Sequence, residues 1–138
     1  MMNTSTDPQL NSRPTILYVE DDNDTRHVIK QSLKRYGYRV FLAVSEEHAL
    51  DNAVGGRIRA DLLLIDLGEP PHIVLAAGRR IRQQAMVRAD APIVVIAFGY
   101  GADMEGKDIN EGGNDYISYF DGSGHFQRLL ARLLNQAA

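Results

Sequence analysis

The sequence predicts a doubly wound α/β domain, with a five-stranded parallel sheet in the order 2-1-3-4-5 and helices on both of its faces. Short apolar runs alternate along the chain with segments of helical periodicity, which is the pattern of stacked βα units. The run Asp61–Ile65 is apolar almost throughout, so its strand should be buried on both faces of a parallel sheet. The length of 138 residues suits one domain, which we expect over residues 14–138, after a flexible polar tail of residues 1–13.

The first half of the chain predicts two strand–helix units and a third strand. A strand at Thr15–Val19 precedes a helix from about Asp24 to Tyr36. A second strand at Tyr38–Val44 precedes a helix that Ser45 caps and that runs through Val54. The third strand, Asp61–Ile65, ends on Asp66. The inward stripe of the first helix is expected to comprise Val28, Ile29 and Leu33.

The second half predicts two further strands and three helices. A helix from Ile73 to about Arg82 should carry its arginines outward, and a buried strand follows at Pro92–Phe98. A helix from about Ala102 to Gly112 is weak, because Gly106 costs about 1 kcal/mol relative to alanine. A strand at Tyr116–Phe120 precedes the last helix, Gly124–Asn135, whose apolar stripe is Phe126, Leu129, Leu130, Leu133 and Leu134. The outward arginines are Arg79, Arg80 and Arg82.

Composition narrows the function classes. The net charge of -3 gives no general attraction to nucleic acid or to an anionic membrane surface. There is no cysteine, so disulfides, thiolate nucleophiles and zinc–thiolate sites are excluded. No apolar run approaches the roughly 20 residues of a membrane span, and the start of the chain does not resemble a signal peptide. We therefore expect a cytoplasmic protein without direct nucleic-acid binding.

Carboxylates follow the first and third strands, which are neighbours in the predicted sheet. Glu20 and Asp21 end the first strand and Asp66 ends the third. Ligands of open α/β sheets bind beyond the carboxyl ends of the strands, so these acids should converge there. Carboxylates at such short distances repel one another unless a cation neutralises them. Mg²⁺ and Mn²⁺ favour oxygen ligands of this kind. An aspartate held beside the cation can act as the nucleophile that forms an aspartyl phosphate.

A purely structural explanation competes with this one. Acidic residues that follow strands often serve as helix caps or solvated loop residues, and Asp22, Asn23 or Asp24 can have that role. Acids at the ends of two buried strands are harder to explain in this way. We therefore interpret Glu20, Asp21 and Asp66 as at least a cation pocket.

These motifs resemble the receiver domains of response regulators in two-component signalling, which have a flavodoxin-like fold. The resemblance rests on Ile16–Asp22 (ILYVEDD), on Asp61–Pro70 (DLLLIDLGEP) and on Gly112–Ile117 (GGNDYI), in the family's order and spacing. It implies that Glu20 and Asp21 bind the metal ion and that Asp66 accepts the phosphoryl group. The metal ligands implied are Glu20, Asp21, Asp66 and the main-chain carbonyl of Gly68. Tyr116 matches an aromatic residue that changes rotamer on activation.

The departures from the family concern the residues that sense the phosphoryl group. Receivers usually end the fourth strand with Thr or Ser, whereas Ala97 occupies that position here. They usually carry lysine at the end of the fifth strand, where Tyr119 stands, and Lys107 falls in the preceding predicted helix. We therefore expect impaired or atypical switching.

Three functions are compatible with these residues. The first is a phosphoaccepting receiver that takes its phosphoryl group from a sensor histidine kinase or a phosphotransfer protein and acts on a downstream protein target, alone or as a homodimer. The second is a degenerate pseudo-receiver, a protein-interaction module that works without phosphorylation. The third, an enzyme, is disfavoured: Glu20, Asp21 and Asp22 would repel a flavin phosphate, and Gly68 replaces the second aspartate of dehalogenase-type phosphatases. We expect a signalling domain rather than an enzyme.

Overall fold

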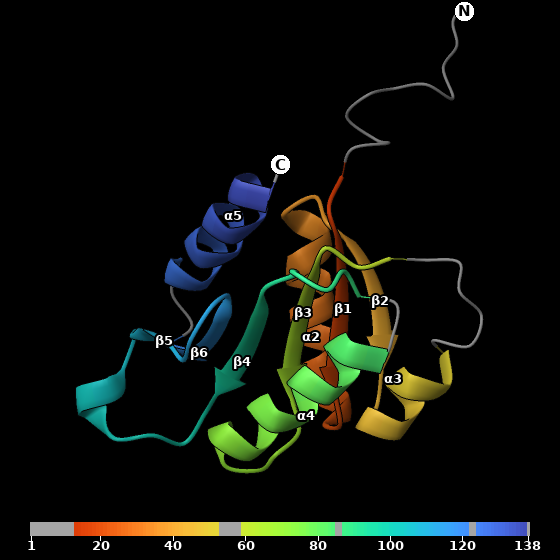
Figure 1. Ribbon diagram of the computed structural model, residues 1–138. Coiled ribbons are helices and arrows are strands. Elements are labelled where there is room, and N and C mark those ends of the chain that lie inside the picture. The colour runs from red at the N-terminus through yellow and green to blue at the C-terminus, as the bar shows by residue number, and fades with distance from the viewer. Residues whose placement is uncertain (1–12, 53–58, 85–86, 122–123, 138) are drawn as a thin grey trace, which may run out of the picture.

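The described residues form one six-stranded sheet with helices on both faces (Figure 1). The computed structural model of the chain describes residues 13–52, 59–84, 87–121 and 124–137, so the predicted tail lies outside it except for Arg13. The strands are β1 (Thr15–Glu20), β2 (Arg39–Ala43), β3 (Leu62–Asp66), β4 (Ile93–Ala97), β5 (Asp108–Asn110) and β6 (Asp115–Tyr119). The helices are α2 (Asn23–Arg35), α3 (Glu46–Asn52), α4 (Pro71–Gln84), α5 (His125–Ala137) and the 3-10 turn η3 (Ala102–Met104).

The order of the sheet is β2-β1-β3-β4-β6-β5. The first five of these strands are parallel and correspond to the five predicted strands in the predicted order 2-1-3-4-5. The central position of β1, β3 and β4 explains their apolar sequences, because both faces of these strands pack against helices. The sixth strand, β5, pairs antiparallel with β6 and was not predicted.

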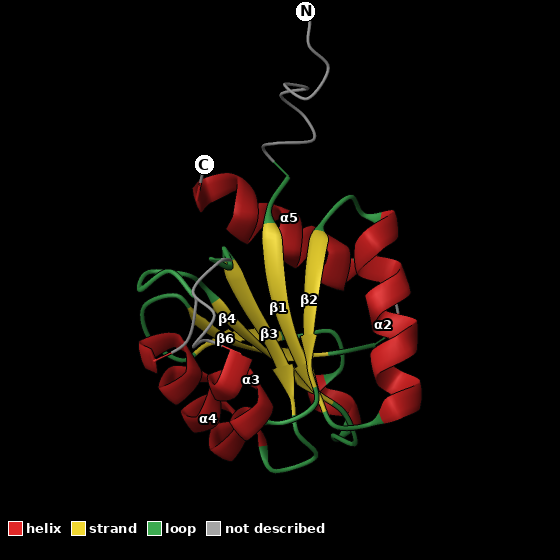
Figure 2. Ribbon diagram, turned by 90° about the vertical axis from the view of Figure 1, so that its right-hand side faces the viewer, coloured by secondary structure: helices red, strands yellow, loops and turns green. Residues whose placement is uncertain are grey.

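Helices cover the two faces of the sheet in pairs. Figure 2 shows α3 and α4 on one side of the strands and α2 and α5 on the other. The predicted stripe of α5 is buried against the same side of the sheet as Ile29 and Leu33 of α2. Val28 was predicted to face inward, but it is 61% exposed, because the buried stripe of α2 is narrower than expected. None of the helices in the described part of the chain has the length and apolar character needed to cross a bilayer.

The segment 102–112 is not the predicted helix. It contains the short turn η3 and then β5, which pairs with β6 in the register Ile109↔Ile117. Gly106 separates the two with φ at +73°, a conformation that ends helical geometry and that side chains with a Cβ rarely adopt. The backbone N–H groups then bond across the hairpin, with Tyr119 N donating to Lys107 O at 2.8 Å.

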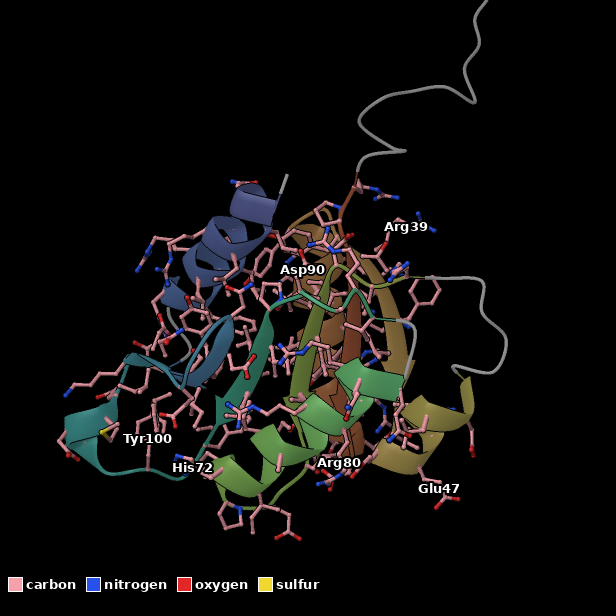
Figure 3. All side chains as sticks on the ribbon, in the orientation of Figure 1. Arg39, Glu47, His72, Arg80, Asp90 and Tyr100 are labelled. Carbon is pink, nitrogen blue, oxygen red and sulfur yellow. The ribbon has the colours of Figure 1, made fainter. Side chains whose placement is uncertain are left out.

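Two smaller expectations concern the helix cap at Ser45 and the arginines of α4. The cap at Ser45 is confirmed, since His48 N donates to Ser45 Oγ at 3.0 Å, whereas Val54 lies outside the described residues. The prediction that Arg79, Arg80 and Arg82 all face outward is only partly right, because their side chains are 48%, 52% and 20% exposed. Arg80 is labelled in Figure 3. It donates to both carboxylate oxygens of Glu46 in α3, at 2.6 and 2.8 Å. Arg82 is turned toward the sheet, where Asp115 attracts it.

Candidate functional site

The candidate site lies where β1 and β3 end side by side. In the parallel register of these two strands, Glu20 is directly opposite Asp66. Asp21 follows Glu20 and is exposed, whereas Asp22 caps α2 by accepting the N–H of Thr25 at 2.7 Å. The carboxyl ends of adjacent parallel strands thus bring the predicted acids to one edge of the sheet, which is where α/β sheets bind ligands.

Glu20 is held by groups of its own chain. Glu20 is 0% exposed. The Tyr18 hydroxyl donates to Glu20 Oε1 at 2.9 Å, and the backbone N–H of Asp22 donates to Oε2 at 3.2 Å. Arg26 also donates to the main-chain carbonyl of Glu20 at 2.8 Å, which fixes the end of β1. Both carboxylate oxygens of Glu20 therefore have protein donors.

Burial raises the affinity of both facing acids for protons. Burial raises the pKa of Glu20 to about 8, and the charge of Asp66 adds to this effect. Burial also raises the pKa of Asp66, with the charges of Asp21 and Asp22 acting in the same direction. The N–H of Gly68, which donates to Asp66 Oδ1 at 3.3 Å, opposes that rise. Negative charge is thus unfavourable at this edge unless a cation balances it.

The loop after β3 brings Gly68 against Asp21. Gly68 has φ at +65°, and a Cβ at this position would lie 3.6 Å from Asp21 Oδ2. Asp21, Asp66 and Gly68 are therefore neighbours. Within the described residues, however, no group of three or more His, Asp or Glu side chains is arranged to hold a metal ion. The hydrogen bonds from Tyr18 and from the N–H of Asp22 hold the Glu20 carboxylate in its present orientation.

The donor set suits a hard cation in its chemistry. It consists of carboxylate oxygens and a main-chain carbonyl, and it carries excess negative charge, which are the features that Mg²⁺ and Mn²⁺ prefer. Asp21 is exposed and Asp66 half-buried, so both can be reached from solvent. The residues present therefore fit such an ion once the side chains rotate around it.

The predicted sensing positions lie at the same edge, on β4 and β6. Ala97 ends β4, is 4% exposed, and is paired in register with Tyr119. The Tyr119 ring packs edge-on against Tyr100, with 5.4 Å between the ring centroids. Lys107 pairs with Tyr119 through the backbone, one strand farther from Asp66. Neither Ala97 nor Tyr119 offers a cation, so the departures seen in the sequence persist in space.

Tyr116 begins the second half of the hairpin rather than ending a strand at the acidic edge. It lies opposite Val94 of β4 and is half-buried against the face covered by α2 and α5. The guanidinium carbon of Arg132 is 6.0 Å from its ring centroid, a cation–π contact with α5. A change in the rotamer of Tyr116 would therefore disturb its contact with Arg132 of α5.

Several polar contacts were not predicted from the sequence. The role of Tyr18 could have been found, because a strand residue two before Glu20 faces the same side of the sheet. The histidines are scattered along the chain without the spacing of a site, but His125 is close to two acids. Its Nδ1 lies 2.8 Å from Asp121 Oδ1 and its Nε2 lies 3.4 Å from Asp108 Oδ1. Asp108 belongs to the unpredicted strand, so no sequence signal pointed to this contact.

Comparison with curated proteins finds relatives among transcriptional regulators. No family model matches the chain. The chain is 32% identical to the transcriptional regulatory protein YxdJ of Bacillus subtilis over 102 residues, which cover 74% of this chain and 42% of that protein. It is 29% identical to the KDP operon transcriptional regulatory protein KdpE of Escherichia coli over 115 residues, which cover 83% and 48%. The chain thus spans less than half the length of the curated relatives it matches.

Comparison with solved structures finds the same fold over nearly the whole chain. The receiver domain of a sensor histidine kinase from Pseudomonas aeruginosa, solved with a magnesium ion in its active-site cleft, is 26% identical, with a TM-score of 0.62. The match covers 90% of this chain and 99% of that one. The chemotaxis protein CheY4 of Vibrio cholerae shares the fold at 20% identity and a TM-score of 0.65, with 89% and 100% covered.

Proposed function

Because this chain is a receiver domain of the response-regulator type, we propose that Asp66 accepts a phosphoryl group in a two-component phosphorelay. The observation that carries the proposal is the position of Asp66, at the carboxyl end of the central strand β3 and opposite a second acid, Glu20. The donor would be a sensor histidine kinase or a phosphotransfer protein, and a downstream protein would read the result. The curated relatives are named as transcriptional regulators, which supports a role in signalling.

In the proposed reaction, a carboxylate oxygen of Asp66 attacks the phosphorus atom while the bond from phosphorus to the donor breaks. The electron pair of that bond leaves with the donor. The nucleophile has to be ionised, and burial, together with the charges of Asp21 and Asp22, opposes this by raising the pKa of Asp66. Mg²⁺ or Mn²⁺, held by Asp21, Asp66, the carbonyl of Gly68 and, after rotation, Glu20, would supply charge compensation. The N–H of Gly68 holds the Asp66 carboxylate in position.

Two positions limit the response of the domain to phosphorylation. Ala97 has no hydroxyl and Tyr119 no positive charge with which to bind the phosphoryl oxygens. A hydrogen bond to a charged group stabilises by about 1.5–3 kcal/mol, so loss of the lysine weakens the phosphorylated state about 10- to 150-fold. We propose that the domain is phosphorylated at Asp66 but switches in an impaired or atypical way.

A second candidate function is a pseudo-receiver that binds a partner protein without phosphorylation. Two observations favour it specifically: the substitutions at Ala97 and Tyr119, and the two protein donors that already occupy the carboxylate of Glu20. In that case the acids would serve the fold and Asp66 would not react.

The test is intact-mass measurement after incubation with acetyl phosphate and Mg²⁺. We expect the mass of one phosphoryl group to be added to the parent chain and to be absent from Asp66→Asn. Asp90→Asn is a matched control, because Asp90 has an exposed carboxylate and lies on the loop before β4. Its adduct should persist. An adduct on another residue would overturn the assignment, and an unmodified parent chain would leave the pseudo-receiver as the function.

A further inference from the structure

The outer side of β5 is the feature with no role in the function proposed above. β5 is the last strand of the sheet, and no other strand among the described residues pairs with its outer edge. Its backbone alternates in direction. Tyr119 N bonds Lys107 O and Glu111 N bonds Asp115 O, so the odd-numbered residues face β6. The N–H and C=O groups of Asp108 and Asn110 therefore point outward, which makes this edge a template for another strand.

The edge is held in an extended shape by its own side chains. The Ser118 hydroxyl donates to Asp108 Oδ1 at 2.7 Å and so ties β5 to β6. The amide of Asn110 closes the following turn, donating to Gly113 O at 2.9 Å and accepting the N–H of Gly112 at 3.1 Å. These side-chain contacts restrict the conformations of Asp108 and Asn110, which lowers the entropic cost of pairing.

The sequence of the edge, Lys107–Glu111 (KDINE), is complementary to itself in the antiparallel direction. With Ile109 opposite Ile109 of a second copy, Asp108 meets the partner's Asn110, so that outward N–H and C=O groups face each other in hydrogen-bonded pairs. The same register sets Lys107 opposite the partner's Glu111, in a pair without backbone bonds, where side chains come closest. A two-fold axis through Ile109 makes every contact occur twice.

We propose that this chain self-associates through β5, pairing antiparallel about Ile109 so that one sheet continues across two copies. The occupant is a second copy, rather than an arbitrary extended peptide, because charge and backbone direction match in one self-complementary register. The Glu111 carboxylate can reach the partner's Lys107, since its present side-chain contact is with His72 Nε2 at 3.1 Å. The His72 side chain, labelled in Figure 3, is 73% exposed. Contacts between exposed groups of this kind are weak and readily exchanged.

The strand is short, so the association should be weak and concentration-dependent. β5 has 3 residues, and small contact areas are typical of weak, transient complexes. The proposal does not depend on phosphorylation, and Asp66→Asn should associate as the parent does. This separates its failure from that of the proposed function.

Sedimentation velocity over a concentration series tests the proposal by charge exchange. Lys107→Glu sets glutamate against the partner's Glu111, and Glu111→Lys sets lysine against the partner's Lys107. Each single variant should raise the dimer dissociation constant at least tenfold. An equimolar mixture of the two should associate, because both ion pairs re-form between unlike copies. The double variant K107E/E111K should associate as the parent does.

Two controls carry the same charge changes elsewhere. Lys34→Glu changes an exposed residue of α2, and Glu47→Lys changes one of α3, whose side chain points away from the helix (Figure 3). Both should associate as the parent does. Circular dichroism checks that each variant is folded. A parent that stays monomeric up to millimolar concentration, a dimer unaffected by either single change, or a mixture that stays monomeric would each overturn the proposal.

Discussion

Asp115 joins β6 to α4 through two arginines. Its residue is 5% exposed, with Arg82 Nη1 donating to Oδ1 at 2.6 Å and Arg79 Nε donating to Oδ2 at 2.8 Å. Burial raises the pKa of Asp115, but these hydrogen bonds and the arginine charges outweigh it and hold the pKa below its ordinary value. The carboxylate is thus favoured in the folded state over the unfolded chain.

Asp115→Asn should therefore destabilise the fold at neutral pH, by about 2–3 kcal/mol in the free energy of unfolding, since charged hydrogen bonds are lost. A carboxyl group with a depressed pKa contributes stability above its unfolded pKa, which is about 4, and loses it as pH falls through the lower folded pKa. The difference between parent and variant should consequently shrink below about pH 4. Urea denaturation at pH 7 and pH 3 measures it; a difference that is the same at both would contradict the assignment.

The sensing positions offer a second test at the scale of single residues. Tyr119→Lys should tighten binding of beryllofluoride, a phosphoryl mimic, about tenfold or more in the presence of Mg²⁺, because a cation is then aimed at the phosphoryl oxygens. Adding Ala97→Thr supplies a hydroxyl donor to the same group, so the two effects should couple. Titration calorimetry gives the affinities. Equal affinity in the parent and the double variant would show that Tyr119 does not occupy the lysine position.

The positions of individual residues were predicted best where strand pairing alone determines them. Glu20 and Asp66 follow apolar runs, so their arrival at one edge follows from parallel pairing alone. The contacts of Asp115 with Arg82, and of His125 with Asp108, join residues from elements whose mutual position no local pattern encodes. The pairing of Glu20 with Tyr18 was within reach, since alternation places both on one face.

At the scale of the element, the segment 102–112 shows where local patterns fail. Its polar and small residues are compatible with a helix, and its one apolar strand residue, Ile109, gives too short an alternation to predict β5. β5 forms because its backbone pairs with the outer edge of β6. A three-residue strand of this kind is decided by tertiary pairing, which intrinsic propensity does not describe.

Gly106→Ala tests what holds this hairpin. The residue has φ at +73°, and an added Cβ would lie 3.0 Å from Asp121 Oδ2. The left-handed conformation costs a non-glycine residue about 1–2 kcal/mol, so the variant should be destabilised by at least about 1 kcal/mol. Thermal unfolding followed by circular dichroism gives the loss. An unchanged or raised Tm would mean that the turn can adopt another conformation without cost.

At the scale of the whole molecule, the parallel sheet was predictable because five apolar runs alternate with amphipathic helices, and only a few topologies accommodate that pattern. The fully buried strands β3 and β4 were the clearest signal, since no polar residue interrupts Leu62–Ile65 or Ile93–Ala97. The orientation of the Glu20 carboxylate could not be predicted to the same degree. It depends on side-chain rotamers at Glu20, which hydrogen bonds from Tyr18 and Asp22 determine.

Stability of the whole domain should report cation binding. A ligand that binds only the folded state, present at about ten times its dissociation constant, stabilises by about 1.4 kcal/mol. For a domain of this size the Tm should rise about 4–6 °C in Mg²⁺. The rise should be lost in Asp21→Asn and kept in Asp24→Asn, whose exposed carboxylate lies in the first turn of α2. Differential scanning fluorimetry measures both, and an equal rise in Asp21→Asn would argue against the acidic edge as the binding site.

The hairpin of β5 and β6 also affects how the chain folds. Its strands are joined by the four residues 111–114, whereas β1 and β3 pair residues as distant as Ile16 and Leu62. The entropy lost on closing a loop grows with its length, and isolated hairpins form in about 1–10 μs. We therefore expect β5 and β6 to pair before β1 and β3 do. The pairing at the far edge of the sheet would then precede the assembly of the acidic edge, so that Asp66 reaches its neighbours only late in folding.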